Sequence, residues 1–427
     1  MATADWVAQV SSEIDAQWIL TSSFLVIFMQ AGFAMLEAGT VSSKNIQNIL
    51  FKNIIDMCIG AIMFFLCGYA LAFGKSSSGF VGFSNFAMND FEMTDYPFWF
   101  FQYAFASAAA TIVSGAVAGR CRIEAYFVYS ILISGFVYPC VVHWVWASDG
   151  WLFKEGFVDF AGSGVVHATG GVVALVAAYI IGPRLDRFMI TDDGSFGDPR
   201  PLPPNNVTMQ ALGVFILWFG WYGFNGGSTV QVTDGGVFLA ARVCVTTTLS
   251  AAAATVTSVP IGKYLNGHFD TGLALNCSLA GLVSITAGCA VVSPAASIII
   301  GIVGAINYVC LSSLVLKLHI DDPLDAFAIH GGCGTWAVIA TGIFIPDTTA
   351  HIFGIQVLGI VCIVAWAAVW ATIIFTLCHY TVGLRVSEQV EVAGIDIHEH
   401  GGAAASTTVT WSLDDILEHR ATRKALM

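Results

Sequence analysis

The chain alternates long apolar stretches with short polar connections over most of its length. Each stretch has the roughly 20 residues that a helix needs to cross the hydrocarbon core of a bilayer. The pattern predicts eleven spanning helices, at residues 18–39, 54–73, 99–118, 126–146, 159–182, 207–225, 237–260, 271–289, 297–316, 325–345 and 355–381. We therefore expect an all-α integral membrane protein.

Basic residues are distributed unevenly over the connections, which indicates how the chain is oriented. Thirteen of the 16 lysines and arginines fall on one side of the predicted membrane: Lys44, Lys52, Arg120, Arg122, Arg184, Arg187, Arg200, Lys263, Lys317, Arg385, Arg420, Arg423 and Lys424. Because such residues gather on the cytoplasmic side, we expect the N-terminus outside and the C-terminus in the cytoplasm. This predicts an extracellular segment at 1–17, a membrane domain at 18–382 and a cytoplasmic tail at 383–427.

The two halves of the membrane domain resemble each other weakly. The fifth predicted span opens with Asp159 and carries His167, and the tenth opens with Asp325 and carries His330. Five spans that are repeated must insert the second copy upside down, which is the inverted-repeat plan of many transporters. We expect the repeats at about 18–182 and 207–345, followed by a final helix at about 355–382. Chance likeness between apolar helices remains the alternative.

His167 lies near mid-depth of its predicted span, among small residues such as Gly164 and Gly170. An ionisable side chain there is costly and usually faces a pathway or a partner. In an inverted repeat His167 and His330 can meet, and two imidazoles can share one proton while each keeps a nitrogen free for a guest. Two alternatives stay open: a hydrogen bond that only joins two helices, and ligation of haem by the paired histidines.

Aromatic residues cluster where several predicted spans end. Phe101 and Phe105 are one helical turn apart and share a face. The other clustered aromatics are Trp144 and Trp146 in the fourth span and Trp218, Trp221, Tyr222 and Phe224 in the sixth. Most such residues are interfacial belt or packing residues. Those at an outer mouth can instead hold a cation over their ring faces.

Composition agrees with a membrane protein and narrows the classes of partner. The chain is 56% hydrophobic and only 11% charged, far from the makeup of soluble domains. The net charge of -13 is spread over loops and tail and argues against nucleic acid as a partner. The first 17 residues lack the basic start of a cleavable signal, so the first apolar segment is expected to be a retained span.

Five separated runs, in order along the chain, carry a family resemblance. They are DFAGSGVVH (159–167), GWYGFNGGS (220–228), AGLVSITA (280–287), DDPLDAFAIHG (321–331) and VGLRV (382–386). Together they resemble the ammonium transporter family, the Amt, Mep and Rh group, and its Amt branch most. The resemblance covers about residues 17–402. It implies a channel-like transporter, not an enzyme, that forms homotrimers with one pore per subunit.

The resemblance also implies roles for individual residues at the outer mouth. Phe105 and Trp146 match the aromatic wall of an outer cation site. Ser228 matches the hydroxyl of that site, and Gln102 lies close by in the matched segment. These four residues are the expected substrate-binding residues.

Deeper in the pore, Phe101 and Phe224 match a stacked pair of phenyl rings that forms the gate. Below that gate, His167 and His330 match the twin histidines of the lumen. The resemblance implies no metal and no cofactor.

Supporting positions can be assigned in the same way. Asp159 matches a carboxylate near the start of the fifth helix, and Thr286 matches a position near the pore. Gly394 and Asp396 match the core of a regulatory tail that packs on the pore mouths.

The sequence therefore predicts transport of ammonium and ammonia, and also of methylammonium, across a plasma membrane. Potassium has a similar size and charge but cannot donate a hydrogen bond. A dry lumen opposes any intact cation, and ammonium can escape that cost by releasing its proton. Two alternatives remain: an ammonium sensor of the same fold, for which the tail is too short to hold an added domain, and a haem-binding membrane redox protein.

Overall fold

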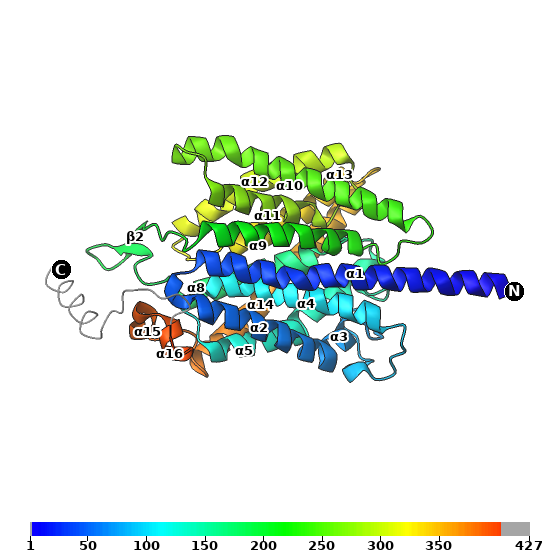
Figure 1. The fold of residues 1–427 in the computed structure, drawn as a ribbon, viewed down its shortest axis with the longest axis horizontal. Helices are drawn as coiled ribbons and strands as arrows, with labels where there is room; N and C mark the ends of the chain where they lie inside the picture. Colours follow the sequence, from blue (N-terminus) through cyan, green and yellow to red (C-terminus); the bar gives the residue numbers. More distant parts are fainter. Residues whose placement is uncertain (1, 403–427) are drawn as a thin grey trace.

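The computed structural model describes residues 2–402, and its long helices lie side by side in one bundle (Figure 1). Ten helical stretches in this part of the chain are long and apolar enough to cross a membrane. An eleventh apolar helix, α11 (Thr271–Thr286), has 16 residues. The expectation of an all-α protein is confirmed.

The first half of the chain contains five of these stretches, and three of them change helical pitch on the way. They comprise α1 (Ala2–Thr40), α2 (Ile46–Met63), η2 (Phe64–Gly68) and α3 (Tyr69–Phe73), α4 (Tyr96–Val117), α5 (Ile123–Leu132), η4 (Ile133–Val137) and α6 (Tyr138–Trp146), and η5 (Ser163–Ala168) with α8 (Thr169–Ile181). Short helices η1 (Ser43–Asn45), η3 (Phe86–Met88) and α7 (Trp151–Lys154) lie in the connections. The segments η2, η4 and η5 are π-helical.

The second half also combines α-helices with π-helical segments, and it follows a small antiparallel hairpin. The hairpin pairs β1 (Phe188–Ile190) with β2 (Phe196–Pro199). The helices are α9 (Val207–Trp221) with η6 (Tyr222–Gly226), α10 (Gly236–Asn266), α11, α12 (Pro294–Lys317), η7 (Phe327–Gly332) with α13 (Cys333–Phe344), and α14 (Ala350–Tyr380). Two short helices, α15 (Glu388–Ala393) and α16 (Ile395–Glu399), form the described part of the tail.

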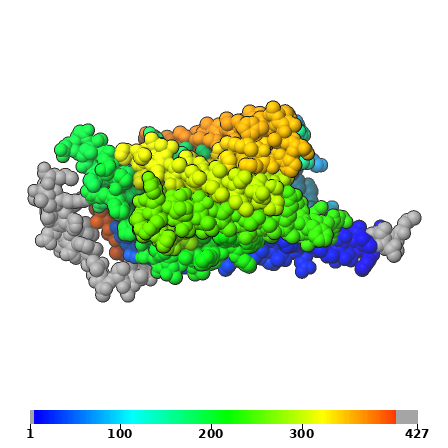
Figure 2. Space-filling view, turned by 90° about the horizontal axis from the view of Figure 1, so that it is seen from above, coloured from blue at the N-terminus to red at the C-terminus, as the bar shows by residue number. Residues whose placement is uncertain are grey.

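Each of the eleven predicted ranges contains a helix, with one clear difference in length. The range 271–289 was expected to be of full spanning length, but α11 ends at Thr286 and is shorter than the other candidates. At the N-terminus, α1 begins at Ala2, so residues 2–17 of the predicted extracellular segment are helical and run on into the first apolar helix. Figures 1 and 2 show this end of α1 projecting beyond the bundle, at the end opposite the β-hairpin and α15.

Close contact between α1 and α9 joins the two halves. A Cβ added to Gly213 would lie 2.4 Å from the backbone nitrogen of Leu36, and one added to Gly32 would lie 3.0 Å from the carbonyl oxygen of Gly213. Only glycines permit such an approach of two helix backbones, which is how helices commonly associate in membranes. The glycine-rich character of the apolar segments therefore serves packing between the halves.

Candidate functional site

Two histidines meet in the interior, one from each half of the chain. Nδ1 of His167 lies 3.1 Å from Nδ1 of His330, and the ring centroids are 5.2 Å apart. At that distance one nitrogen donates and the other accepts, so the pair holds one shared hydrogen and the two rings have opposite tautomers. Nε2 of His167 is buried and has no hydrogen-bond partner among the described residues. The predicted meeting of the two histidines is confirmed.

Glycines bring the two histidine-bearing segments into contact. A Cβ on Gly171 would lie 2.0 Å from the backbone nitrogen of Gly331, and one on Gly334 would lie 2.5 Å from the carbonyl oxygen of Ser163. Both histidines lie on π-helical turns, η5 and η7, which often occur at functional sites. The altered pitch and the small residues together let the two rings face each other.

The spacing of the pair suits a hydrogen bond better than a shared metal. A metal held at about 2.0 to 2.1 Å from each of two imidazole nitrogens on opposite sides would separate them by about 4 Å. The observed separation is 3.1 Å. Among residues 2–402, no group of three or more His, Cys, Asp or Glu side chains is arranged to hold a metal ion.

A column of stacked aromatic rings begins at His167 and includes Phe224 and Phe105. The ring of Phe224 lies 5.4 Å from that of His167, and Phe105 stacks on Phe224 with 4.0 Å between centroids and 25° between planes. The sequence predicted Phe101 as the stacking partner of Phe224, and this prediction is wrong. Phe101 instead packs tilted on Phe105, at 4.7 Å. Both phenylalanines lie on one face of α4, but Phe105 is one turn further along the helix and is the ring that reaches Phe224.

Phe105 therefore belongs to the stack and also contacts Trp146, its partner in the expected outer wall. On its outer side it meets Trp146 edge to face, with 5.9 Å between centroids. The indole Nε1 of Trp146 donates to the carbonyl oxygen of Asp159 at 2.8 Å, which fixes the ring. The hydroxyl of Ser228 donates to the carbonyl oxygen of Phe224 at 2.8 Å, so its lone pairs remain available to accept from a guest. Gln102 is buried, and its Oε1 has no hydrogen-bond partner in the described structure.

The carboxylate of Asp159 caps the π-helical turn that carries His167. Oδ1 accepts from the backbone N–H groups of Gly162 and Ser163, at 3.1 and 2.7 Å. Oδ2 accepts from those of Gly164 and Val165, at 2.8 and 2.9 Å. The first four N–H groups of a helix have no acceptor within the helix. Here one buried carboxylate accepts from four such groups. Asp159 thus positions the histidine and does not itself reach the pair.

Trp221 lies beside the histidine pair, although the sequence assigned it no role in the site. The sequence grouped it with belt or packing aromatics, and the structure buries it completely and stacks its ring on His167, at 5.1 Å and 16°. Its Nε1 donates to the hydroxyl of Thr286 at 2.9 Å, so Thr286 is linked through Trp221 to the histidine pair. The motif GWYGFNGGS, which contains it between two glycines, was the available signal.

The tail binds to the start of α2. The carboxylate of Asp396 accepts from the backbone N–H groups of Gln47 and Asn48, at 2.9 and 2.8 Å, at the helix end where an anion is favoured. Gly394 has a φ of 105°, and a Cβ there would lie 2.6 Å from the Cβ of Lys44, so glycine is required. The ammonium group of Lys44 donates to two carbonyls near the end of α15. The structure thus brings Gly394 and Asp396 to one contact; the rest of the predicted tail, 403–427, lies outside the described residues.

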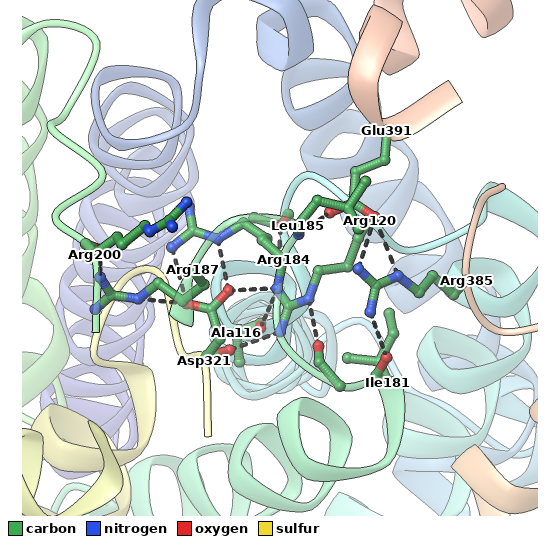
Figure 3. Close-up of polar contacts among 12 residues, drawn as sticks. Ala116, Arg120, Ile181, Arg184, Leu185, Arg187, Arg200, Asp321, Arg385 and Glu391 are labelled. Atoms are coloured by element: carbon green, nitrogen blue, oxygen red, sulfur yellow. Dashed lines mark hydrogen bonds and ion pairs between the residues drawn. The ribbon is translucent and has the colours of Figure 1, made fainter. Parts of the chain in front are cut away.

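Arginines connect this end of the bundle to the loop before η7 (Figure 3). Arg184 holds the carboxylate of Asp321 with Nε and Nη2, at 2.7 and 2.9 Å, and Arg120 donates to the carbonyl oxygen of the same residue. Burial alone would raise the pKa of Asp321, but Arg184 and Arg120 hold it well below its usual range. On the tail side, Glu391 accepts from Arg385 at 2.8 Å and from the backbone of Leu185 at 2.7 Å. The tail is therefore linked, through neighbouring residues, to the loop that leads to His330.

Comparison with known proteins places this architecture in one family. The model of the Ammonium Transporter Family matches residues 17–405. Ammonium transporter 1 member 3 of Solanum lycopersicum is 39% identical, with 94% of this chain and 95% of that protein covered. Ammonium transporter 3 of Dictyostelium discoideum is 40% identical, with 92% and 94% covered.

Solved structures agree. A Sensor Amt Protein superimposes with a TM-score of 0.87 at 34% identity, covering 93% of this chain and all of that one. Mep2 of Candida albicans gives a TM-score of 0.80 at 29% identity, covering 88% and 87%. The chain is a multi-pass membrane protein and belongs to the ammonium transporter family.

Proposed function

We propose that this protein moves ammonium across a membrane, taking it up at an outer aromatic site and passing it as ammonia beside His167 and His330. The observation that carries the proposal is the hydrogen-bonded histidine pair beneath the stacked rings of Phe105 and Phe224. The family relationship supports the same substrate. Methylammonium, one methyl group larger, is a second expected substrate.

Capture at the outer mouth depends on charge and hydrogen bonding together. The faces of Trp146 and Phe105 offer cation–π contact, worth roughly 0.5 to 2 kcal/mol per ring depending on desolvation. The hydroxyl of Ser228 can accept hydrogen bonds from a guest, because its own hydrogen is already donated to the carbonyl oxygen of Phe224. The ring faces and the oxygen lone pairs attract any cation, but only ammonium can also donate directed hydrogen bonds to Ser228.

Passage below the stack discriminates by deprotonation. His167, Phe224 and Trp221 pack ring to ring, so the walls of this region are apolar and buried. Moving an intact ion into such surroundings costs on the order of 20 kcal/mol in the idealised Born limit. Ammonia avoids that cost, and the free imidazole nitrogens of the pair can bind it as it passes. Phe105 and Phe224 would act as the gate, and they must separate for the guest to enter.

The arrangement of the whole protein follows from the same proposal. We place the N-terminal end of α1 outside the cell and the hairpin and tail in the cytoplasm, because most basic residues lie at the latter end. The eleven helices are proposed to form a five-plus-five inverted repeat and a final helix, with His167 and His330 at the pseudo-symmetric centre. We propose a homotrimer in the plasma membrane, in which the tail contact at Gly394 and Asp396 regulates the pore.

Liposomes that contain the purified protein test the proposal directly. Uptake and current are measured together for ammonium, methylammonium and potassium. We expect ammonium and methylammonium transport with little potassium current. Replacing His167 by Asp should admit intact cations, because a carboxylate compensates their charge, and potassium current should appear. Replacing His167 by Ala should reduce ammonium transport, since His330 then loses a hydrogen bond worth about 1 to 3 kcal/mol when buried.

A matched control is His379, which is exposed on α14, away from the histidine pair. His379→Asp should leave both transport and selectivity unchanged. Normal selectivity in well-assembled His167→Asp and His167→Ala proteins would refute the twin-histidine mechanism. Absence of ammonium transport by the wild-type protein would favour the sensor alternative.

A further inference from the structure

A second polar cluster lies in the first half of the chain, between helices α1, α2, α4 and α5. Gln30 and Glu37 are two turns apart on α1, and Ser107, Thr111 and Ser114 follow one face of α4. The two faces meet, because the amide nitrogen of Gln30 donates to the hydroxyl of Ser107 at 2.8 Å and the hydroxyl of Ser114 donates to Glu37. The cluster is therefore a ladder of side chains that follows the helix axes.

Two carboxyl groups are buried in this ladder without a cation. Asp56 is fully buried, and its two carboxyl oxygens lie 2.5 and 2.7 Å from the hydroxyl oxygens of Ser130 and Thr111. Glu37 is 1% exposed, and besides Ser114 it accepts from the side-chain amide of Asn53 at 2.6 Å. Among the described residues neither carboxyl forms an ion pair. Burying a carboxylate without a paired charge is strongly unfavourable, which favours the neutral acid.

Lys52 is the nearest candidate for a counter-ion, but its contacts point elsewhere. Its ammonium group donates to the carbonyl oxygen of Cys121 at 2.7 Å and lies 5.6 Å from the ring centre of Tyr126. The carboxyls are therefore held by hydroxyl and amide groups, which are neutral. Neutral donors satisfy oxygen lone pairs but do not cancel a charge.

The contacts of Thr111 tie the protonation of Asp56 to the orientation of the Gln30 amide. The Thr111 hydroxyl has a single hydrogen, yet its oxygen contacts two acceptors, Oε1 of Gln30 at 2.9 Å and Oδ2 of Asp56 at 2.7 Å. If Asp56 is ionised, one of these contacts joins two oxygens with no hydrogen between them. If Oδ2 carries a proton, Asp56 donates to Thr111, Thr111 donates to Gln30, and every contact is a hydrogen bond.

One other arrangement also satisfies the ladder, and it links proton loss to a side-chain movement. When Asp56 loses its proton, Thr111 must donate to it. The side-chain amide of Gln30 must then rotate by about 180°, so that its nitrogen donates to Thr111 and its oxygen accepts from Ser107. The orientation of Gln30 is thus coupled to the protonation of Asp56.

We propose that Asp56 is a proton-binding site of the first half of the chain, distinct from the histidine pair, and that Gln30 turns over when the proton leaves. The other titratable or charged groups that face the site are Glu37 from α1, Lys52 from α2, Tyr103 from α4, and Tyr126 and Tyr129 from α5. The ligand is a proton, and the site holds it by an acid that donates to a hydroxyl.

The site is coupled to the pore wall through α1. Phe33 lies one turn after Gln30, and its ring is 6.3 Å from that of His330. A change in the hydrogen bonds of Gln30 therefore acts on the helix that packs against the lumen. This part of the inference rests on the proposed transport function.

Infrared spectroscopy of the purified protein in lipid tests the site itself. At neutral pH the wild-type protein should show carbonyl stretches of protonated carboxyls, and Asp56→Asn should remove one component of this absorption while Glu37→Gln removes another. Glu155→Gln, a matched change at an exposed carboxylate, should leave this band unchanged. Absence of the absorption from the wild-type protein, or undiminished absorption in Asp56→Asn, would overturn the assignment.

The variants also separate a protonated acid from an ionised one. Asparagine mimics the protonated form, because its nitrogen can donate to Thr111 while its oxygen accepts from Ser130, so Asp56→Asn should fold in normal yield. If it fails to fold, Thr111→Val provides the second measurement. That variant removes the acceptor of the proposed proton, so the carbonyl band should shift in frequency, and an unshifted band would contradict the proposal.

Ammonium uptake as a function of pH tests the coupling to the pore. Asparagine at position 56 mimics the protonated carboxyl at every pH. The ratio of ammonium uptake by the wild-type protein to uptake by Asp56→Asn should therefore change across the pH range in which the infrared band titrates. A constant ratio, with the band titrating, would refute the coupling while the proton site stands. Loss of uptake in all proteins alike would instead count against the transport function.

Discussion

Replacing Asp159 by Asn should displace the turn that carries His167 without introducing a steric change. The carboxylate has two oxygens, and each accepts from two backbone N–H groups: Oδ1 from Gly162 and Ser163, and Oδ2 from Gly164 and Val165. An asparagine side chain keeps only one acceptor oxygen. Whichever way the amide is oriented, its NH2 group faces two N–H donors that have lost their acceptor.

The size of the effect follows from that count. A buried donor that loses its partner costs about 1 to 3 kcal/mol. Two such donors destabilise the fold by about 2 to 6 kcal/mol. The start of η5 also loses its favourable interaction with a negative charge. A local shift of η5 relieves part of this cost, and such a shift moves His167 away from His330. We therefore expect lower thermal stability together with a large loss of ammonium transport.

Both quantities can be measured on the same preparation. Thermal unfolding of the purified protein gives stability, and uptake into liposomes gives transport, with Glu155→Gln as an exposed acid-to-amide control. Asp159→Asn should be impaired in both assays, whereas the control should match the wild type. Unchanged stability and unchanged uptake in Asp159→Asn would show that the four N–H groups do not depend on the carboxylate, and the capping argument would fail.

Three further predictions follow from other parts of the structure. Replacing Trp146 by Leu should raise the ammonium concentration needed for half-maximal transport by roughly 2- to 30-fold, the equivalent of 0.5 to 2 kcal/mol of cation–π contact, with folding intact; an unchanged concentration dependence would make the ring a belt residue. Replacing Asp396 by Asn should release the tail from the first amides of α2, seen as faster proteolysis after Arg385 and reduced uptake; full uptake with a released tail would exclude its role in the gate. Burial and the nearby Asp325 carboxylate raise the pKa of Asp322 to about 7, so its proton stabilises the fold below the unfolded pKa and this contribution is lost as the pH rises to about 7. Asp322→Asn should therefore flatten the stability profile between about pH 4 and 7, and an unchanged slope would contradict this.

Much of the site was predictable because it depends on local sequence. Apolar length predicted the helices, and the glycines beside His167 and His330 predicted close approach of their segments. The family resemblance that the five motifs carry supplied the expected roles of the histidines, aromatics and tail residues. Each of these features is a property of residues close together in the sequence. They can therefore be recognised before the rotation of each helix about its axis is known.

The partner of Phe224 illustrates what the sequence left undecided. Phe101 and Phe105 are the same residue type, one turn apart on one face, and no local signal tells which one reaches Phe224. The depth of α4 relative to η6 decides it, and that depth is set by contacts between segments more than a hundred residues apart in the chain. The same reason explains why Trp221 could be taken for a belt residue, although its ring is stacked on His167.

The sequence by itself determined the helices, the family and the residue types available to the pore. The tertiary structure alone decided which atoms meet: Nδ1 with Nδ1 in the histidine pair, Phe105 with Phe224, and Asp56 with Thr111. Helical periodicity fixes which residues share a face, but the rotation and axial shift of each helix against its neighbours come from packing across the whole bundle. A hydrogen bond or a ring stack depends on shifts smaller than one turn, so these contacts could be read only from the assembled fold.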